Sequence, residues 1–83
     1  MDNQSIISRL KPILDTYVED KALLQDINED TDFIRDLKIN SANLVDIVLD
    51  VEEAFGIVID NAAMERMLTI GAAITIIKEQ LNQ

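Results

Sequence analysis

Apolar side chains recur at three- and four-residue steps along most of this chain of 83 residues, and this spacing constrains its fold more than any other feature. Such a step places the side chains on one face of an α-helix, and helices with one apolar face must share a core. The stretches with this pattern run roughly over Ile6 to Val18, Ser41 to Gly56, Asn61 to Met67 and Thr69 to Leu81. The sequence therefore predicts an all-α fold, a small four-helix bundle with a long first loop and a short third helix. We expect one domain over residues 1–83, with its core at about 6–81, because so short a chain cannot fill two cores.

The helical period is lost between Glu19 and Asn40, where acidic residues are crowded together. We expect a long connection with one short helical turn, held to the core by scattered apolar side chains: Leu23, Leu24, Ile27, Phe33, Ile34 and Leu37. Part of this connection imitates the start of a calcium-binding EF loop, but Thr31 stands where Gly is needed and Leu37 where a bidentate Glu is needed. We therefore predict a solvated acidic surface here and no metal site.

The composition excludes several functional classes. Without Cys or His, the chain has no thiol nucleophile, no zinc-finger ligand set and no Ser–His–Asp triad, so we predict no catalytic residues and no enzyme. Seven Lys and Arg against 16 Asp and Glu give a formal net charge of −9, which disfavours nucleic acid and acidic lipid as partners and favours partners with basic patches. The start of the chain lacks the pattern of a signal peptide, and no apolar run is long enough to span a membrane. We expect a cytoplasmic protein.

The second helical stretch is the clearest element, and we expect Ser41 to cap its start and Gly56 to end it in a left-handed conformation. Its outer faces carry four acids and no Lys or Arg: Asp46, Asp50, Glu52 and Glu53. A hydroxyl at a helix start faces solvent, and a phosphate ester there gains from free N–H groups and the helix dipole. Ser41 is therefore both a candidate cap and a candidate attachment point for a phosphorylated prosthetic group.

Longer runs in this region resemble the acyl carrier protein family. They are the run from Asp36 to Val48, which contains Asn40-Ser41-Ala42, the ending Phe55-Gly56-Ile57, and the flanking segments Thr31-Asp32-Phe33 and Leu68-Thr69-Ile70-Gly71-Ala72-Ala73. The resemblance extends over nearly the whole chain, about Ile6 to Leu81, and the length and the acidic helix agree with it.

The resemblance implies a cofactor and a function. A 4′-phosphopantetheine group, taken from coenzyme A by a separate Mg²⁺-dependent phosphopantetheinyl transferase, would be esterified to Ser41. Its thiol would carry acyl chains as thioesters and present them to fatty-acid or polyketide-type biosynthetic enzymes, such as ketosynthases, acyltransferases or acyl ligases with basic patches. The carrier itself would make no bonds, and we expect it to be a monomer.

Position-by-position matching to the family also implies two groups of residues. The surface that partner enzymes recognise would comprise Asn40, Ala42, Asn43, Val45, Asp46, Leu49, Asp50, Glu52 and Glu53. The acyl chain would lie among apolar side chains that belong to the helix core in any case: Leu44, Val48, Val51, Ile59, Met64 and Met67. The family usually has Asp-Ser-Leu where this chain has Asn40-Ser41-Ala42, which removes a charge and an apolar contact beside the serine. These two departures predict a specialised carrier with dedicated partners.

Two other functions remain open. The same fold can serve as an interaction or regulatory subunit that is never modified, and Asn40 and Ala42 favour that alternative, whereas the retained Ser41 opposes it. An aminoacyl or peptidyl carrier is also compatible with the motif, although such carriers usually have a less acidic second helix.

Overall fold

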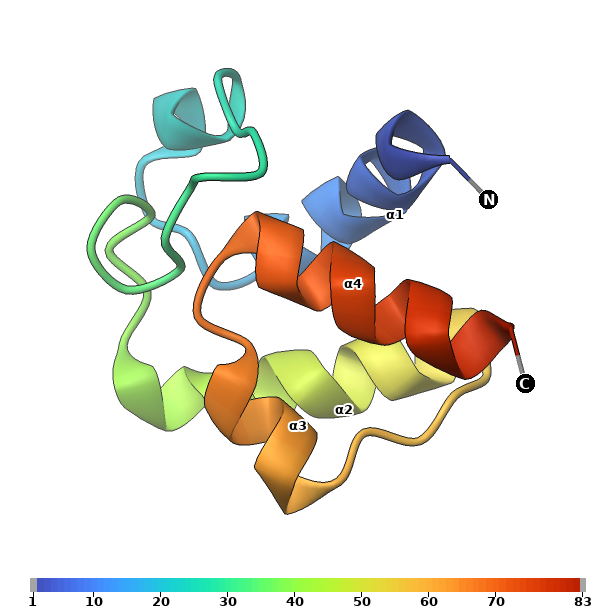
Figure 1. Ribbon diagram of the computed structural model, residues 1–83. Coiled ribbons are helices and arrows are strands. Elements are labelled where there is room, and N and C mark those ends of the chain that lie inside the picture. Colours follow the sequence, from blue (N-terminus) through green and yellow to red (C-terminus); the bar gives the residue numbers. More distant parts are fainter. Residues whose placement is uncertain (1, 83) are drawn as a thin grey trace.

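The structure, a computed structural model, describes residues 2–82 of the chain (Figure 1). Four α-helices and two 3₁₀ turns follow one another as α1 (Asn3–Asp15), η1 (Lys21–Leu24), η2 (Ser41–Asn43), α2 (Leu44–Phe55), α3 (Asn61–Arg66) and α4 (Ile70–Leu81). Over residues 2–82 the sole β pairing is an isolated bridge between Asp32 and Thr69. The prediction of an all-α fold with a long first loop and a short third helix is confirmed.

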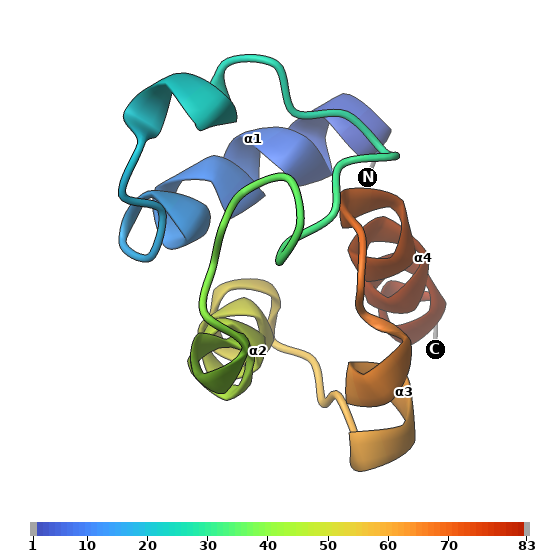
Figure 2. The same ribbon diagram turned by 90° about the vertical axis from the view of Figure 1, so that its left-hand side faces the viewer.

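The core lies where α1, α2 and α4 meet, and α1 packs against both of the other long helices. Figure 2 looks along α2 and shows α1 crossing above α2 and α4, with the short α3 below α4. The side chains that line this core are aliphatic apart from Phe33 and Phe55. On α4 the buried residues include Ile70, Ala73, Ile74 and Ile77, which lie at the three- and four-residue steps that predicted this helix. No helix of the described chain is long and apolar enough to cross a membrane.

The first helix ends earlier than its apolar pattern predicts. It stops at Asp15, and the N–H groups of Tyr17 and Val18 both bond to the Leu14 carbonyl in a closing turn. The ammonium group of Lys21 then bonds to the carbonyl of Asp15, the last residue of the helix, and to that of Val18 in the closing turn. Val18 is nevertheless buried, so the apolar pattern extends past the helix itself.

The long connection between α1 and α2 is held against the start of α4 by three backbone hydrogen bonds. Phe33 N–H bonds to the Leu68 carbonyl (3.1 Å), Ile70 N–H to that of Thr31 (2.9 Å), and Gly71 N–H to that of Glu29 (2.8 Å). The predicted apolar anchors of the connection are buried or half-buried, with one exception. Ile34 is 36 % exposed, because it lies in a turn that the Asp32 carboxylate caps on the surface.

Between α2 and α3 the chain turns back through the extended residues Ile57, Val58 and Ile59. Ile59 is buried and Ile57 half-buried, but Val58 is 72 % exposed. Alternate residues of an extended segment point to opposite sides, so the middle residue faces outward. Gly56 precedes this segment in the predicted left-handed conformation, with φ of 66°.

Candidate functional site

The helical segment of η2 and α2 begins where the long connection ends (Figure 1). Ser41 is the first residue of η2 and lies on the surface. The connection approaches it through two buried side chains, Leu37 and Ile39, with Lys38 between them in the left-handed region at φ of 59°. The buried neighbours fix the path of the backbone, while Asn40, Ser41 and Ala42 are all exposed. The serine is thus presented to solvent from an anchored stretch of chain.

The helical segment is capped by Asn40, and the prediction that Ser41 caps it is wrong. The Asn40 side-chain oxygen accepts the N–H of Ala42 at 2.9 Å, and the 3₁₀ turn Ser41–Asn43 leads from there into α2. Asn is as good a cap as Ser, and here the Asn40 side chain makes the capping bond. The Ser41 hydroxyl makes no hydrogen bond within residues 2–82. A group joined to this oxygen through a phosphodiester, such as 4′-phosphopantetheine, would therefore break no side-chain hydrogen bond of Ser41 within residues 2–82.

The outer face of the same segment combines apolar and acidic side chains. Val45 is 50 % and Leu49 55 % exposed, and Asp46 and Glu53 are exposed beside them. With Ala42 these residues follow one another at three- and four-residue steps, so they form one stripe along the helix. Neither Asp46 nor Glu53 forms an ion pair with another described residue. We call this set (Ala42, Val45, Asp46, Leu49 and Glu53) the α2 stripe.

The other two acids predicted for partner recognition are bonded within the molecule. Asp50 accepts a hydrogen bond from the Tyr17 hydroxyl at 2.8 Å, and this bond raises the pKa of Tyr17 above its ordinary value of 10.0. Glu52 accepts the N–H of Ile59 at 2.6 Å through its Oε2 atom. Both side chains are half-buried, as is that of Asn43. Sequence reasoning missed these two contacts because Tyr17 and Ile59 lie on other elements, and no local pattern pairs them with α2.

The six side chains predicted to surround an acyl chain are part of one core. Val48, Val51, Ile59 and Met67 are buried, and Leu44 and Met64 are half-buried and pack against that core. They come from α2, from the segment after it and from α3 and its end. The structure thus brings the predicted cluster together, and its interior is filled by its own side chains.

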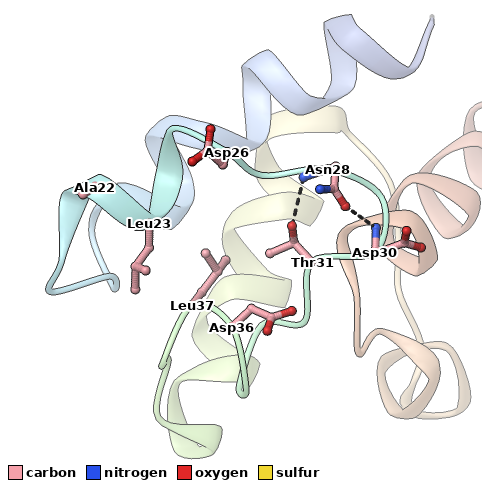
Figure 3. Close-up of a pocket in the computed structure, with 8 residues that line it drawn as sticks. All are labelled: Ala22, Leu23, Asp26, Asn28, Asp30, Thr31, Asp36 and Leu37. Atoms are coloured by element: carbon pink, nitrogen blue, oxygen red, sulfur yellow. Dashed lines mark hydrogen bonds between the residues drawn. The ribbon is translucent and has the colours of Figure 1, made fainter.

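A cavity of about 350 Å³ lies elsewhere, within the long connection (Figure 3). It is lined by Ala22, Leu23, Asp26, Asn28, Asp30, Thr31, Asp36 and Leu37. Several of its polar side chains cap the backbone of the connection itself: Thr31 Oγ1 accepts Asn28 N–H, and Asn28 Oδ1 accepts Asp30 N–H. Over residues 2–82 there is no group of three or more His, Cys, Asp or Glu arranged to hold a metal ion. The cavity does not coincide with the cluster predicted for the acyl chain.

Comparison with known proteins identifies both a family and relatives. A family model described as "Phosphopantetheine attachment site" matches residues 17–77. The chain is 33 % identical over 79 residues to an acyl carrier protein of Lactobacillus acidophilus, covering 94 % of this chain and 95 % of the relative. It is 32 % identical over 78 residues to an acyl carrier protein of Picosynechococcus, covering 94 % of each, and 36 % identical over 56 residues to one of Thermotoga maritima, covering 68 % and 69 %.

Proposed function

Because this chain belongs to the acyl carrier protein family and carries a 4′-phosphopantetheine prosthetic group, we propose that Ser41 is the residue to which the group is attached. One observation carries the assignment. The Ser41 hydroxyl is exposed and makes no hydrogen bond to another described residue, while Asn40 caps the helical segment in its place. Ser41 stands at the N-terminal end of the helical segment of η2 and α2, and the dipole of α2 favours a negatively charged phosphodiester at this end.

The residues around Ser41 have separable roles in this proposal. The Ser41 hydroxyl oxygen is the atom that becomes esterified, and Asn40 holds the backbone turn that presents it. Leu37 and Ile39 anchor the approaching chain in the core, so the exposed triplet has a fixed position. When bound, the group supplies the thiol to which an acyl chain is joined as a thioester. The protein itself contributes attachment, presentation and shelter, and we propose that it performs no catalysis.

The α2 stripe is the surface that we propose for partner enzymes. Asp46 and Glu53 are free to attract a basic patch, and Val45 and Leu49 offer exposed apolar area beside them. Opposite charges accelerate encounter without requiring tight binding, and a carrier must leave each partner quickly. The partners are a phosphopantetheinyl transferase and enzymes of the ketosynthase, acyltransferase or acyl-ligase type. We propose that the carrier works as a cytoplasmic monomer.

The attachment is tested by intact mass spectrometry after incubation with coenzyme A, Mg²⁺ and a broad-specificity phosphopantetheinyl transferase. We expect a gain of one phosphopantetheinyl group in the wild-type protein and none in Ser41→Ala. Ser5→Ala, which changes another exposed serine, is the matched control and should load normally. A fully folded wild-type protein that gains no mass would oppose the proposal and favour the unmodified interaction subunit.

The partner surface is tested by the association rate with the same transferase at low salt. We expect Asp46→Asn combined with Glu53→Gln to lower this rate by about tenfold, and added salt to reduce the difference. Asp26→Asn combined with Asp30→Asn makes the same change in net charge on the long connection and is the control. Equal effects of the two double variants would show that net charge alone matters, and would contradict the assignment of the α2 stripe.

The departures Asn40 and Ala42 bear on which enzymes are served. Asn40 keeps the capping bond that an Asp would make, but without its charge, and the exposed Ala42 offers little apolar area. We therefore propose a specialised carrier with dedicated partners. Normal elongation of its cargo by a general fatty-acid synthase would refute this specialisation, while loading with an aminoacyl group by a ligase from its own pathway would favour an aminoacyl carrier.

A further inference from the structure

Glu52 controls the reversal of the chain at the end of α2. Its backbone carbonyl accepts the N–H groups of Gly56 and Ile57, the latter at 3.1 Å, as expected where a glycine ends a helix. Its side chain then reaches further along the chain, and Oε2 accepts the N–H of Ile59 at 2.6 Å. One residue thus holds the chain that leaves the helix at three N–H groups, those of Gly56, Ile57 and Ile59.

This segment, residues 57–60, joins α2 to α3 and forms one wall of the predicted acyl cluster. Figure 2 shows it running from the far end of α2 across to α3. Ile59 is 7 % exposed and packs in the core, and its neighbour Asp60 caps α3 by accepting the N–H of Ala63 at 2.8 Å. A movement of Ile59 away from the core therefore also moves the start of α3.

An acyl chain cannot enter the cluster without such a movement. Val51 from α2 and Met67 from the end of α3 have exposed fractions of 0 % and 1 %, so the interior is already filled. Space for a chain must come from separating α2 from the segment and α3, because close-packed cores yield by moving elements and not by compression. The bond between Glu52 and Ile59 directly opposes that separation.

We propose that Glu52 is a positioning residue for the cargo: its carboxylate latches the Ile59 segment closed, and release of this latch admits or exposes the acyl chain. The inference rests on the proposed function, because it assumes an acyl cargo on Ser41. It also separates Glu52 from its neighbour Glu53, whose exposed carboxylate belongs to the α2 stripe. The latch needs a hydrogen-bond acceptor at this position, whereas docking on a basic patch needs a negative charge.

Glu52→Gln distinguishes the two roles, because the amide keeps an acceptor oxygen and loses the charge. Glu52→Ala loses both, and Glu53→Ala removes a charge that makes no bond to the segment. The first readout is amide hydrogen exchange in the unmodified protein. We expect the Ile59 amide to exchange about tenfold faster in Glu52→Ala and within about twofold of wild type in the other two variants. The Val51 amide, inside α2, serves as the internal reference for global unfolding.

The second readout is cleavage of the thioester by hydroxylamine in protein loaded from octanoyl-coenzyme A. Glu52→Ala should be cleaved several-fold faster than wild type, and Glu52→Gln and Glu53→Ala at nearly the wild-type rate. An unchanged Ile59 amide in Glu52→Ala, or equal acceleration of cleavage in Glu52→Gln and Glu52→Ala, would overturn the latch. Failure of the wild-type protein to load would instead overturn the proposed function and the cargo role with it, while the exchange data would still decide whether the Glu52 bond holds the segment.

Discussion

The long connection before α2 and the helix α2 itself are both rich in acidic residues, and they use them in opposite ways. In the connection, Asp20 accepts the N–H of Ala22, and Asp32 accepts those of Ile34 and Arg35 at 2.8 Å. In α2, Asp46 and Glu53 face solvent without such partners among the described residues. A helix bonds its own N–H groups internally, so its carboxylates stay free, whereas an irregular segment leaves N–H groups that short acidic side chains can satisfy.

The role of an acidic residue therefore depends on whether the backbone around it leaves N–H groups without a partner. The same residue type bonds the backbone of the connection and stays free on α2, where we propose that it binds partners. The exceptions in α2, Asp50 and Glu52, occur where another part of the chain approaches with an unsatisfied donor: the Tyr17 hydroxyl and the Ile59 N–H. The surface of α2 that we propose for partner enzymes is therefore narrower than the total charge of the helix indicates.

The largest difference in stability between the two regions is expected when a buried anchor of the connection is removed. Phe33 is 1 % exposed, and Phe33→Ala should lower the free energy of unfolding by about 3–5 kcal/mol. Leu49→Ala, on the exposed α2 stripe, should change it by less than about 0.5 kcal/mol. Urea unfolding followed by circular dichroism measures both, and similar losses in the two variants would contradict the division into a structural connection and a binding helix.

A smaller effect is expected where the connection touches α4. A Cβ added at Gly71 would lie 2.8 Å from the Glu29 carbonyl oxygen, a backbone atom that cannot rotate away. Gly71→Ala should therefore lower the free energy of unfolding by about 1–2 kcal/mol, although alanine is the better helix former. The same urea titration measures it. Ala72→Gly, one residue along, is the control and should show only the cost of helix propensity, about 1 kcal/mol, with the contact to Glu29 intact.

Each region also contains one residue in the left-handed backbone conformation, a glycine at the end of α2 and a lysine in the connection. Gly56 ends α2 at φ of 66°, while Lys38 in the connection has φ of 59° with a full side chain. Lys38→Gly should raise the free energy of unfolding by about 0.5–1 kcal/mol, and Gly56→Ala should lower it by about 1 kcal/mol, since a Cβ there meets no atom within 4 Å and only backbone strain remains. A loss of stability in Lys38→Gly would show that the lysine side chain makes a contribution larger than the strain.

The smallest expected effect is on the pH dependence of stability. The hydrogen bond from Arg35 N–H, and with it that from Ile34 N–H, lowers the pKa of Asp32 below its ordinary value of 3.8. Because the folded-state pKa is the lower one, the stabilisation is complete above pH 3.8 and is lost as the pH falls through the lowered value. The melting temperature of wild type should exceed that of Asp32→Ala at pH 7, and the difference should fade below pH 3.8.

The matched control is Asp30→Ala, which removes an exposed acid of the same connection whose carboxylate bonds to no backbone N–H within residues 2–82. It reports the effect of net charge alone. If the two variants follow the same pH profile, the Asp32 bonds contribute nothing beyond charge.

Much of the fold could be predicted from the sequence, because helices are specified by local spacing. The ranges of α3 and α4, the left-handed Gly56 and the inward stripe of α4 follow from residues a few positions apart. The errors lie where local preferences compete: both Asn40 and Ser41 are good caps, and their order along the chain does not say which is used. The exposed position of Ile34 likewise depends on the turn that Asp32 caps.

The candidate site, like the fold, could be predicted only in part from the sequence. The sequence indicated the serine and the acidic helix, because each is a pattern within one short segment, and the resemblance to the family implied the apolar cluster. The roles of individual acids depended on which distant groups reached them. Tyr17 and Ile59 donate hydrogen bonds to Asp50 and Glu52. Asp46 and Glu53 receive no such bond from a described residue. Hydrogen bonds between segments form only when packing brings a donor to an acceptor. The sequence therefore determined which acidic side chains α2 carries, and the tertiary structure decided which of them stay free of hydrogen bonds to other segments.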